Sequence, residues 1–135
     1  MAAFLFKTEP SEYAFANLVR DKRTTWEGVS NALALIHLRA VKKGDTIVIY
    51  HTGNEKRAVG LAVATRGAYP DPKADDPRRV VVDVKPVRAL PAPVALAVFK
   101  RDPVLCATEL VRISRLSVMP ITDAQLARVL ALAKA

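Results

Sequence analysis

Residues 42–51, KKGDTIVIYH, carry the strongest strand pattern in the chain. A turn is predicted at Gly44, and the β-branched and aromatic run IVIY that follows is typical of a strand. Residues 57–66, RAVGLAVATR, carry a second such run beyond the polar segment TGNEK. Two strand patterns joined by a short polar segment predict an antiparallel hairpin in the middle of the chain.

Further strands are predicted on both sides of this hairpin. Residues 4–8, FLFKT, are short, aromatic and bounded by Pro10. Residues 80–90, VVVDVKPVRAL, resume the strand pattern. Pro86 within them predicts an edge or a bulge, because proline cannot donate to a strand ladder. A last strand is predicted within residues 112–121, RISRLSVMPI.

Helices are predicted between these strands and at the C-terminus. The three internal ones are expected within residues 11–21, 32–41 and 93–102. Ser11 is expected to cap the first of them, and Pro93 to lie in the first turn of the third. Thr122 and Gln125 have the spacing of a capping box, which predicts the start of a C-terminal helix. Loops are predicted over 24–31 and 68–79.

The order of these elements indicates an α+β fold. About five strands are interspersed with helices, without the regular βαβ alternation of parallel sheets. We therefore expect a curved or closed antiparallel sheet flanked by helices, built by a single domain over residues 1–135. A chain of this length buries a sizeable core without disulfides or metal, and we expect no cofactor.

Composition favours a folded, soluble, cytoplasmic protein. Apolar residues make up 51% of the chain and charged residues 25%, and charged side chains interrupt every apolar run before it reaches the length of a membrane span. The N-terminus has no basic segment of the kind that precedes a signal sequence. Cys106 is the only cysteine, which excludes an internal disulfide, and we expect it to be a small buried residue.

The excess of positive charge predicts a polyanionic partner. The 21 Lys and Arg residues against 13 Asp and Glu give a formal net charge of +8, enough to steer nucleic acid toward a small protein. The charges are dispersed, so any basic surface has to be assembled by the fold. The candidate phosphate-binding residues are Arg20, Arg23, Arg78, Arg79, Arg112 and Arg115.

The sequence gives no sign of catalysis, and we expect the protein not to be an enzyme. The glycine-rich, serine and histidine motifs of common phosphate-binding, hydrolase and metalloprotease sites are missing. His37 lies in a predicted helix among apolar neighbours, where a packed or surface role is favoured. His51 ends a predicted strand, and a general base would require it to meet a carboxylate such as Glu9 or Asp45.

Six segments along the chain resemble one family in their order and composition. They are FKTEPSEY (6–13), TTWEGVSN (24–31), GDTIVIYH (44–51), VGLAVA (59–64), AYPDP (68–72) and RLSVMP (115–120). In these segments the chain resembles the EVE domain family, which belongs to the PUA-like superfamily and is related to YTH domains and to thymocyte nuclear protein. The resemblance implies a PUA-like β-barrel of about five to six strands flanked by helices, and the binding of modified bases in DNA or RNA.

The resemblance also implies a base pocket in the N-terminal third. Trp26 is either a stacking platform for a flipped base or a core residue, because both roles suit a single tryptophan. Asn31 either reads a base edge or caps the following helix. Lys7 either meets a phosphate or base carbonyl or is a solvated strand end. The pocket residues implied are Lys7, Glu9, Ser11, Trp26, Val29, Ser30, Asn31, Tyr50, His51 and Ser117.

Three positions depart from the family pattern. Ser30 stands where the family usually has arginine, and Leu33 and Met119 stand where it usually has glutamine. Each replaces a long polar side chain at a segment expected near the pocket, so contacts to a base edge would be lost.

Two kinds of function follow from these observations. The first is a non-catalytic module that binds nucleic acid and accommodates a modified base, working with a separately encoded effector protein. The alternative is a module that uses the same pocket for a nucleobase-like metabolite or a partner protein. A free nucleoside competes in either case if the pocket alone binds, whereas a long oligonucleotide is needed if the basic surface contributes.

Overall fold

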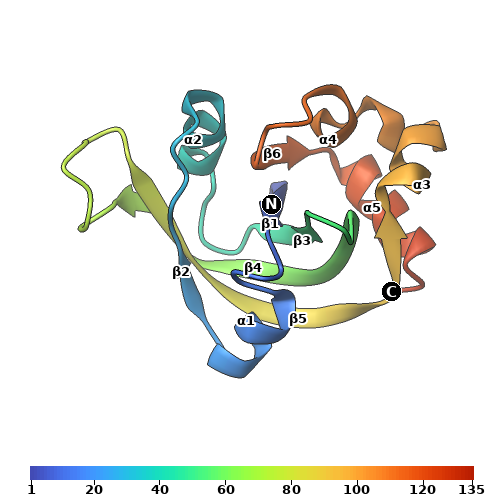
Figure 1. The fold of residues 1–135 in the computed structure, drawn as a ribbon, viewed down its shortest axis with the longest axis horizontal. Coiled ribbons are helices and arrows are strands. Elements are labelled where there is room, and N and C mark those ends of the chain that lie inside the picture. Colours follow the sequence, from blue (N-terminus) through green and yellow to red (C-terminus); the bar gives the residue numbers. More distant parts are fainter.

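The computed structural model describes all 135 residues as a curved six-stranded sheet with helices on its margins (Figure 1). The strands are β1 (Ala3–Thr8), β2 (Thr24–Trp26), β3 (Thr46–His51), β4 (Arg57–Pro70), β5 (Val80–Ala95) and β6 (Val118–Ile121). The helices are α1 (Phe15–Asp21), α2 (Ala32–Arg39), α3 (Leu96–Arg101), α4 (Glu109–Arg112) and α5 (Asp123–Leu132), with a 3-10 turn at Leu105–Ala107. No helix has the length and apolar character needed to cross a membrane.

The sheet is mixed and open, so the expectation of a closed antiparallel barrel is wrong in part. Its strand order is β2-β5-β4-β3-β1-β6, which leaves β2 and β6 as edges. β1 and β3 pair in parallel, with Phe4 opposite Ile47 and Lys7 opposite Tyr50, while the other pairs are antiparallel. A parallel pair needs a long crossover, and the segment containing α1, β2 and α2 supplies it. The α+β class and the curvature agree with the prediction.

The predicted hairpin is present as β3 and β4, and β4 continues into a longer hairpin with β5. Four register shifts interrupt the β4–β5 ladder, and such bulges bend a sheet. Pro86 lies opposite Ala62 at one of these shifts and beyond the segment of β5 that pairs with β2, which confirms the predicted bulge or edge. The strands also take in residues 68–70, predicted as loop, and residues 93–95, predicted as helical.

The first helix begins later than predicted. Residues 9–13 form a turn in which the Glu9 carbonyl accepts from the Glu12 and Tyr13 amides, so Ser11 is not the cap. The Asn17 side chain accepts from the Ala14 amide at 2.7 Å instead and closes the helix start. The ring of Phe15 then lies against Gly60 of β4, where any Cβ atom would collide with the ring. This contact holds α1 close to the sheet.

The core is continuous and contains the aromatic and aliphatic residues of the central strands. Leu5, Phe6, Ile47 and Val48 are fully buried. The C-terminal capping box is confirmed, because the Gln125 amide donates to Thr122 Oγ1 at 3.1 Å and the Thr122 amide donates to Gln125 Oε1 at 2.9 Å. The prediction for Cys106 is wrong: it lies exposed in the 3-10 turn.

Asp102 ties the end of α3 to α5. Its carboxylate accepts from the Val104 and Leu105 amides at 2.9 and 3.1 Å and pairs with the Arg128 guanidinium at 2.7 Å. Burial opposes ionisation, but the Arg128 bond and the two amides outweigh it and hold the pKa of Asp102 below its usual 3.8.

Asp102→Asn should therefore lower the free energy of unfolding at neutral pH. A depressed folded-state pKa stabilises the fold above the usual value of 3.8, and this contribution is lost as the pH falls through the lower folded value. Urea unfolding of both proteins across this range should show the difference shrinking in acid. Asp75→Asn is the matched control, because Asp75 is exposed and makes no side-chain bond. A difference that persists unchanged in acid would contradict the role of the carboxylate.

Candidate functional site

A pocket of about 580 Å³ opens between the end of β1, the turn after it, β2 and the start of α2. Its lining residues are Lys7, Thr8, Glu9, Glu12, Tyr13, Thr24, Thr25, Trp26, Glu27, Gly28, Val29, Ser30, Asn31 and Ser117. The crossover from β1 to β3 supplies most of this wall. The β6 side closes it, because the Lys7 amide donates to the Ser117 carbonyl at 2.9 Å.

Trp26 is both a wall of the pocket and part of the core. Its ring centroid lies 5.3 Å from that of Phe6 and 6.5 Å from that of Tyr13, which meets it edge-on. Only 9% of the residue is exposed. The indole is therefore held by packing in the core, and its remaining exposed part borders the pocket.

Lys7 extends from β1 across the pocket to the α4–β6 loop. Its Nζ donates to the Ser114 carbonyl at 2.8 Å. Burial lowers the pKa of this amine from its usual 10.5, because the charged form loses water around it. The ammonium therefore has unused donors in a poorly hydrated place, where a carbonyl or an anion is a favourable partner.

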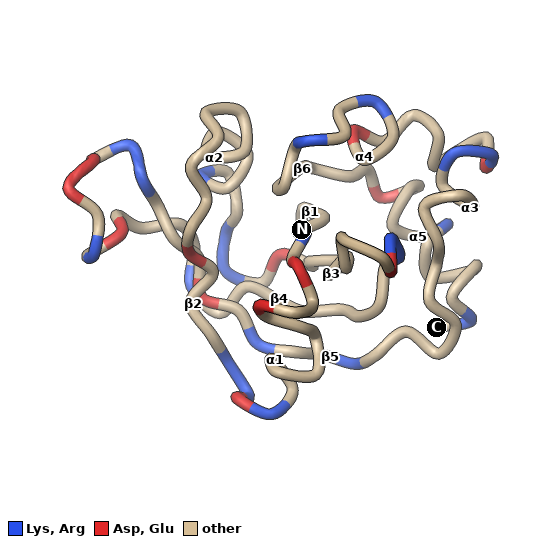
Figure 2. Tube along the Cα trace, viewed as in Figure 1, with Lys and Arg blue, Asp and Glu red and all other residues tan.

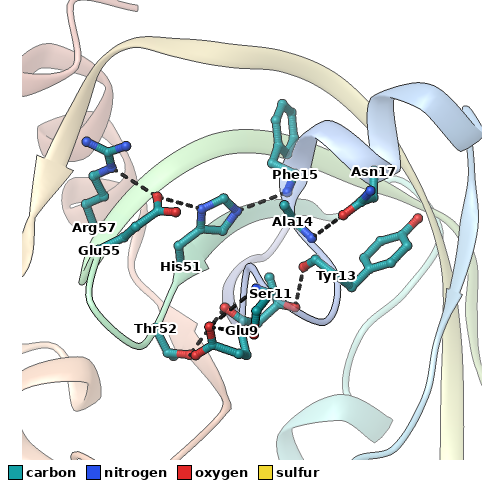
Figure 3. Close-up of polar contacts among 11 residues, drawn as sticks. Glu9, Ser11, Tyr13, Ala14, Phe15, Asn17, His51, Thr52, Glu55 and Arg57 are labelled. Atoms are coloured by element: carbon teal, nitrogen blue, oxygen red, sulfur yellow. Dashed lines mark hydrogen bonds and ion pairs between the residues drawn. The ribbon is translucent and has the colours of Figure 1, made fainter.

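The turn that forms one side of the pocket is fixed by Glu9 (Figure 3). Its carboxylate accepts from the Ser11 amide and hydroxyl at 3.3 and 3.2 Å and from the Thr52 hydroxyl at 3.2 Å. The Thr8 hydroxyl donates to the Tyr13 carbonyl at 2.6 Å across the same turn. Ser11 supports this turn from outside the pocket and is not among the lining residues.

Asn31 caps α2 and lines the pocket at the same time. Its Oδ1 accepts from the Ala34 amide at 3.0 Å, so the capping role considered from the sequence is confirmed. The side-chain amide group of Asn31 makes no bond within the chain and keeps two donors. The side chains of Ser30, Ser117 and Glu12 likewise make no hydrogen bond within the chain and line the pocket.

Tyr50 and His51 were expected in the pocket and lie outside it. Tyr50 is buried in β3, which raises the pKa of its hydroxyl to about 12. His51 Nε2 accepts from the Phe15 amide at 3.0 Å, and Nδ1 lies 2.9 Å from Glu55 (Figure 3). The imidazole therefore carries its proton on Nδ1 and joins α1 to the β3–β4 turn.

This arrangement corrects the histidine pairing considered from the sequence. The carboxylate partner of His51 is Glu55, not Glu9 or Asp45, and the hydrogen bond from His51 lowers the pKa of Glu55. Both ring nitrogens are used in this network, which leaves no lone pair for a substrate. Asp45 instead accepts from the Ala2 and Lys42 amides.

Half of the residues that line the pocket were not predicted from the sequence. They are Thr8, Glu12, Tyr13, Thr24, Thr25, Glu27 and Gly28, and all of them fall inside the two segments that suggested the pocket. They were missed because β2 was predicted as a loop. As a strand it pairs with β5 and turns the Trp26 segment toward the end of β1.

The arginines considered for phosphate binding divide into two groups. Arg20 pairs with Asp21 at 2.9 Å and Arg78 pairs with Asp76 at 2.9 Å. Arg23, Arg79, Arg112 and Arg115 make no ion pair. Basic residues are spread over the whole molecule, and they include some on the α4 side and others in the loop after β4 (Figure 2).

Two of the three departures from the family pattern lie outside the pocket. Met119 is fully buried in β6 opposite Leu5, and Leu33 is an exposed residue of α2. Ser30 alone lines the pocket. The expectation that all three substitutions remove base contacts is therefore wrong for Met119, which fills the core.

Comparison with known proteins identifies the fold and its relatives. The EVE domain model matches residues 2–132. Rpa0253 from Rhodopseudomonas palustris has a TM-score of 0.93 at 36% identity, covering 99% of this chain and 94% of that chain. Human THYN1 protein, in complex with 5-methylcytosine-containing DNA, has a TM-score of 0.90 at 27% identity, covering 100% of this chain and 99% of that one.

Two further comparisons show a more limited similarity. Human thymocyte nuclear protein 1 is 35% identical over an alignment of 95 residues that covers 58% of this chain and 42% of that protein, so the match spans less than half of its length. The YTH domain of Zygosaccharomyces rouxii MRB1, in complex with N6-methyladenosine RNA, has a TM-score of 0.58 at 15% identity. That likeness concerns the fold alone.

Proposed function

Because the chain belongs to the EVE domain family, we propose that it binds nucleic acid and holds a modified base in the pocket beside Trp26. The observation that carries this proposal is the pocket, in a fold that matches the human THYN1 protein in complex with 5-methylcytosine-containing DNA. The pocket in this chain combines an aromatic wall with polar side chains.

The chemistry of the lining residues supports a planar heterocycle as ligand. A flipped base is held by contact with an aromatic side chain and by hydrogen bonds at its edge. Trp26 and Tyr13 offer the apolar wall, and the Asn31 amide and Lys7 ammonium offer donors. Glu12 and the hydroxyl of Ser117 offer acceptors. The pocket therefore offers partners for both the acceptor atoms and the donor atoms of a base edge.

The test is a binding titration with labelled oligonucleotides that carry cytosine, 5-methylcytosine, 5-hydroxymethylcytosine or N6-methyladenine. We expect saturable binding that favours one modified base over its unmodified parent. Asn31→Asp should weaken it roughly tenfold, because one lost hydrogen bond to a base costs about 1–3 kcal/mol. Asp caps helices as well as Asn does, so the fold should be retained.

The same titration at rising salt separates the pocket from the basic surface. Affinity for an oligonucleotide should fall steeply with salt, because each neutralised phosphate releases counterions. A modified nucleoside alone should bind with little dependence on salt. Binding without preference for any modified base, together with unchanged affinity in Asn31→Asp, would contradict the proposal.

A further inference from the structure

Three exposed apolar side chains lie on α2 and directly after α4. They are Leu33, Ile36 and Ile113, which are 38%, 57% and 39% exposed. We name these three residues the apolar lip. The buried face of α2 is formed by Ala34, Leu35 and Leu38, so Leu33 and Ile36 belong to the face that the core leaves uncovered.

A contact between the two helices places the lip at the rim of the pocket. His37 Nε2 of α2 lies 3.3 Å from Glu109 Oε2 of α4. Leu33 precedes His37 by one helical turn and so lies on the same side of α2 as the contact. Ile113 directly follows α4, and its amide donates to the Glu109 carbonyl at 2.7 Å. The start of α2 lies at the pocket through Asn31.

The end of α4 lies at the pocket as well. The Ser114 carbonyl, directly after Ile113, accepts from Lys7 Nζ at 2.8 Å, and Lys7 lines the pocket. Leu33 in α2 and Ile113 directly after α4 are therefore each about one helical turn nearer to the pocket than the contact between His37 and Glu109. The apolar lip continues the pocket wall outward.

Positive charge surrounds the apolar lip. Arg112 and Arg115 flank Ile113 in the chain, and neither makes an ion pair. Arg39 follows Ile36 by one turn and donates to the Arg78 carbonyl, so its charge is not neutralised by a carboxylate. The nearby carboxylate of Glu109 faces His37. An apolar surface bordered by unpaired arginines complements a nucleotide, which offers an apolar base next to an anionic phosphate.

We propose that the apolar lip contacts the nucleotide that neighbours the base held in the pocket, while Arg112 and Arg115 contact its phosphates. This inference rests on the proposed function. Proteins that bind the minor groove insert apolar side chains such as Leu and Ile between base steps, so such side chains suit a base that has lost its stacking neighbour. The lip thereby makes binding of a strand tighter than binding of the modified nucleoside alone.

The test compares a variant carrying Leu33→Ser and Ile36→Ser with the parent protein. Affinity for the preferred modified oligonucleotide should fall roughly tenfold, the size expected when two half-exposed aliphatic side chains no longer leave water. Binding of the modified nucleoside alone should stay unchanged. Val87→Ser is the matched control, because Val87 is 57% exposed, as Ile36 is, and lies in β5. This control should leave both affinities unchanged.

Several outcomes would overturn the inference. Unchanged oligonucleotide affinity in the double variant would remove the lip from the interface. An equal loss of nucleoside binding would place the effect in the pocket instead. Sedimentation showing a parent dimer that the double variant no longer forms would assign the lip to a second copy of the chain. If the parent protein binds the modified nucleoside but no oligonucleotide, the role of the lip is refuted and the pocket proposal is not. If it binds neither, the proposed function is refuted as well.

Discussion

Trp26→Ala should lower the free energy of unfolding by about 3–5 kcal/mol, the range for removing a large aromatic side chain from a core. The expectation follows from the burial of Trp26 and from its ring contacts with Phe6 and Tyr13. The loss should be measured by urea unfolding followed by far-ultraviolet circular dichroism, because the variant has no tryptophan emission.

Trp26→Phe is the control that separates packing from binding. It keeps an aromatic ring against Phe6, so it should lose much less stability than the alanine variant, while offering a smaller ring to a ligand. We expect a folded protein with weakened oligonucleotide binding. A loss of less than about 1 kcal/mol in Trp26→Ala would contradict the core role of the indole.

His51→Ala should cost about 2–4 kcal/mol, although His51 lies outside the pocket. The change removes the acceptor of the buried Phe15 amide, and a buried donor left without its partner costs about 1–3 kcal/mol. It also leaves a hole where the imidazole, 7% exposed, is now packed. Equilibrium unfolding in urea measures the loss.

Glu55→Ala is the matched control for His51. It removes the partner of Nδ1 but keeps the bond from the Phe15 amide to Nε2. Because Glu55 is mostly at the surface, its loss should be much smaller, as is usual for exposed pairs. Equal losses in the two variants would mean that the exposed pair, not the buried amide, accounts for the role of His51.

The strands of the core were predictable because their residues repeat a local pattern. The run IVIY and the segment RAVGLAVATR combine β-branched residues with a polar turn, and both form strands where expected. The capping box of α5 is equally local. The parallel pairing of β1 with β3 was not predictable from such patterns, because pairing partners are chosen by tertiary packing.

The pocket was predictable in part, because the resemblance to the EVE domain family implied it. Lys7, Glu9, Trp26, Val29, Ser30, Asn31 and Ser117 all line it. Tyr50 and His51 are neighbours in β3 and both are buried, and a sequence does not say which face of a strand meets a pocket formed by another element. The short strand β2 escaped prediction, since three residues carry too little periodicity to distinguish a strand from a loop.

The central claim is that a modified base enters the pocket beside Trp26, and Trp26 emission tests it most directly because the chain has a single tryptophan. The protein is titrated at low salt with the preferred modified oligonucleotide and with its unmodified twin. We predict a saturable change in emission that is larger and occurs at lower concentration with the modified strand. Saturable binding of both strands with equal affinity and no change in Trp26 emission would contradict the account.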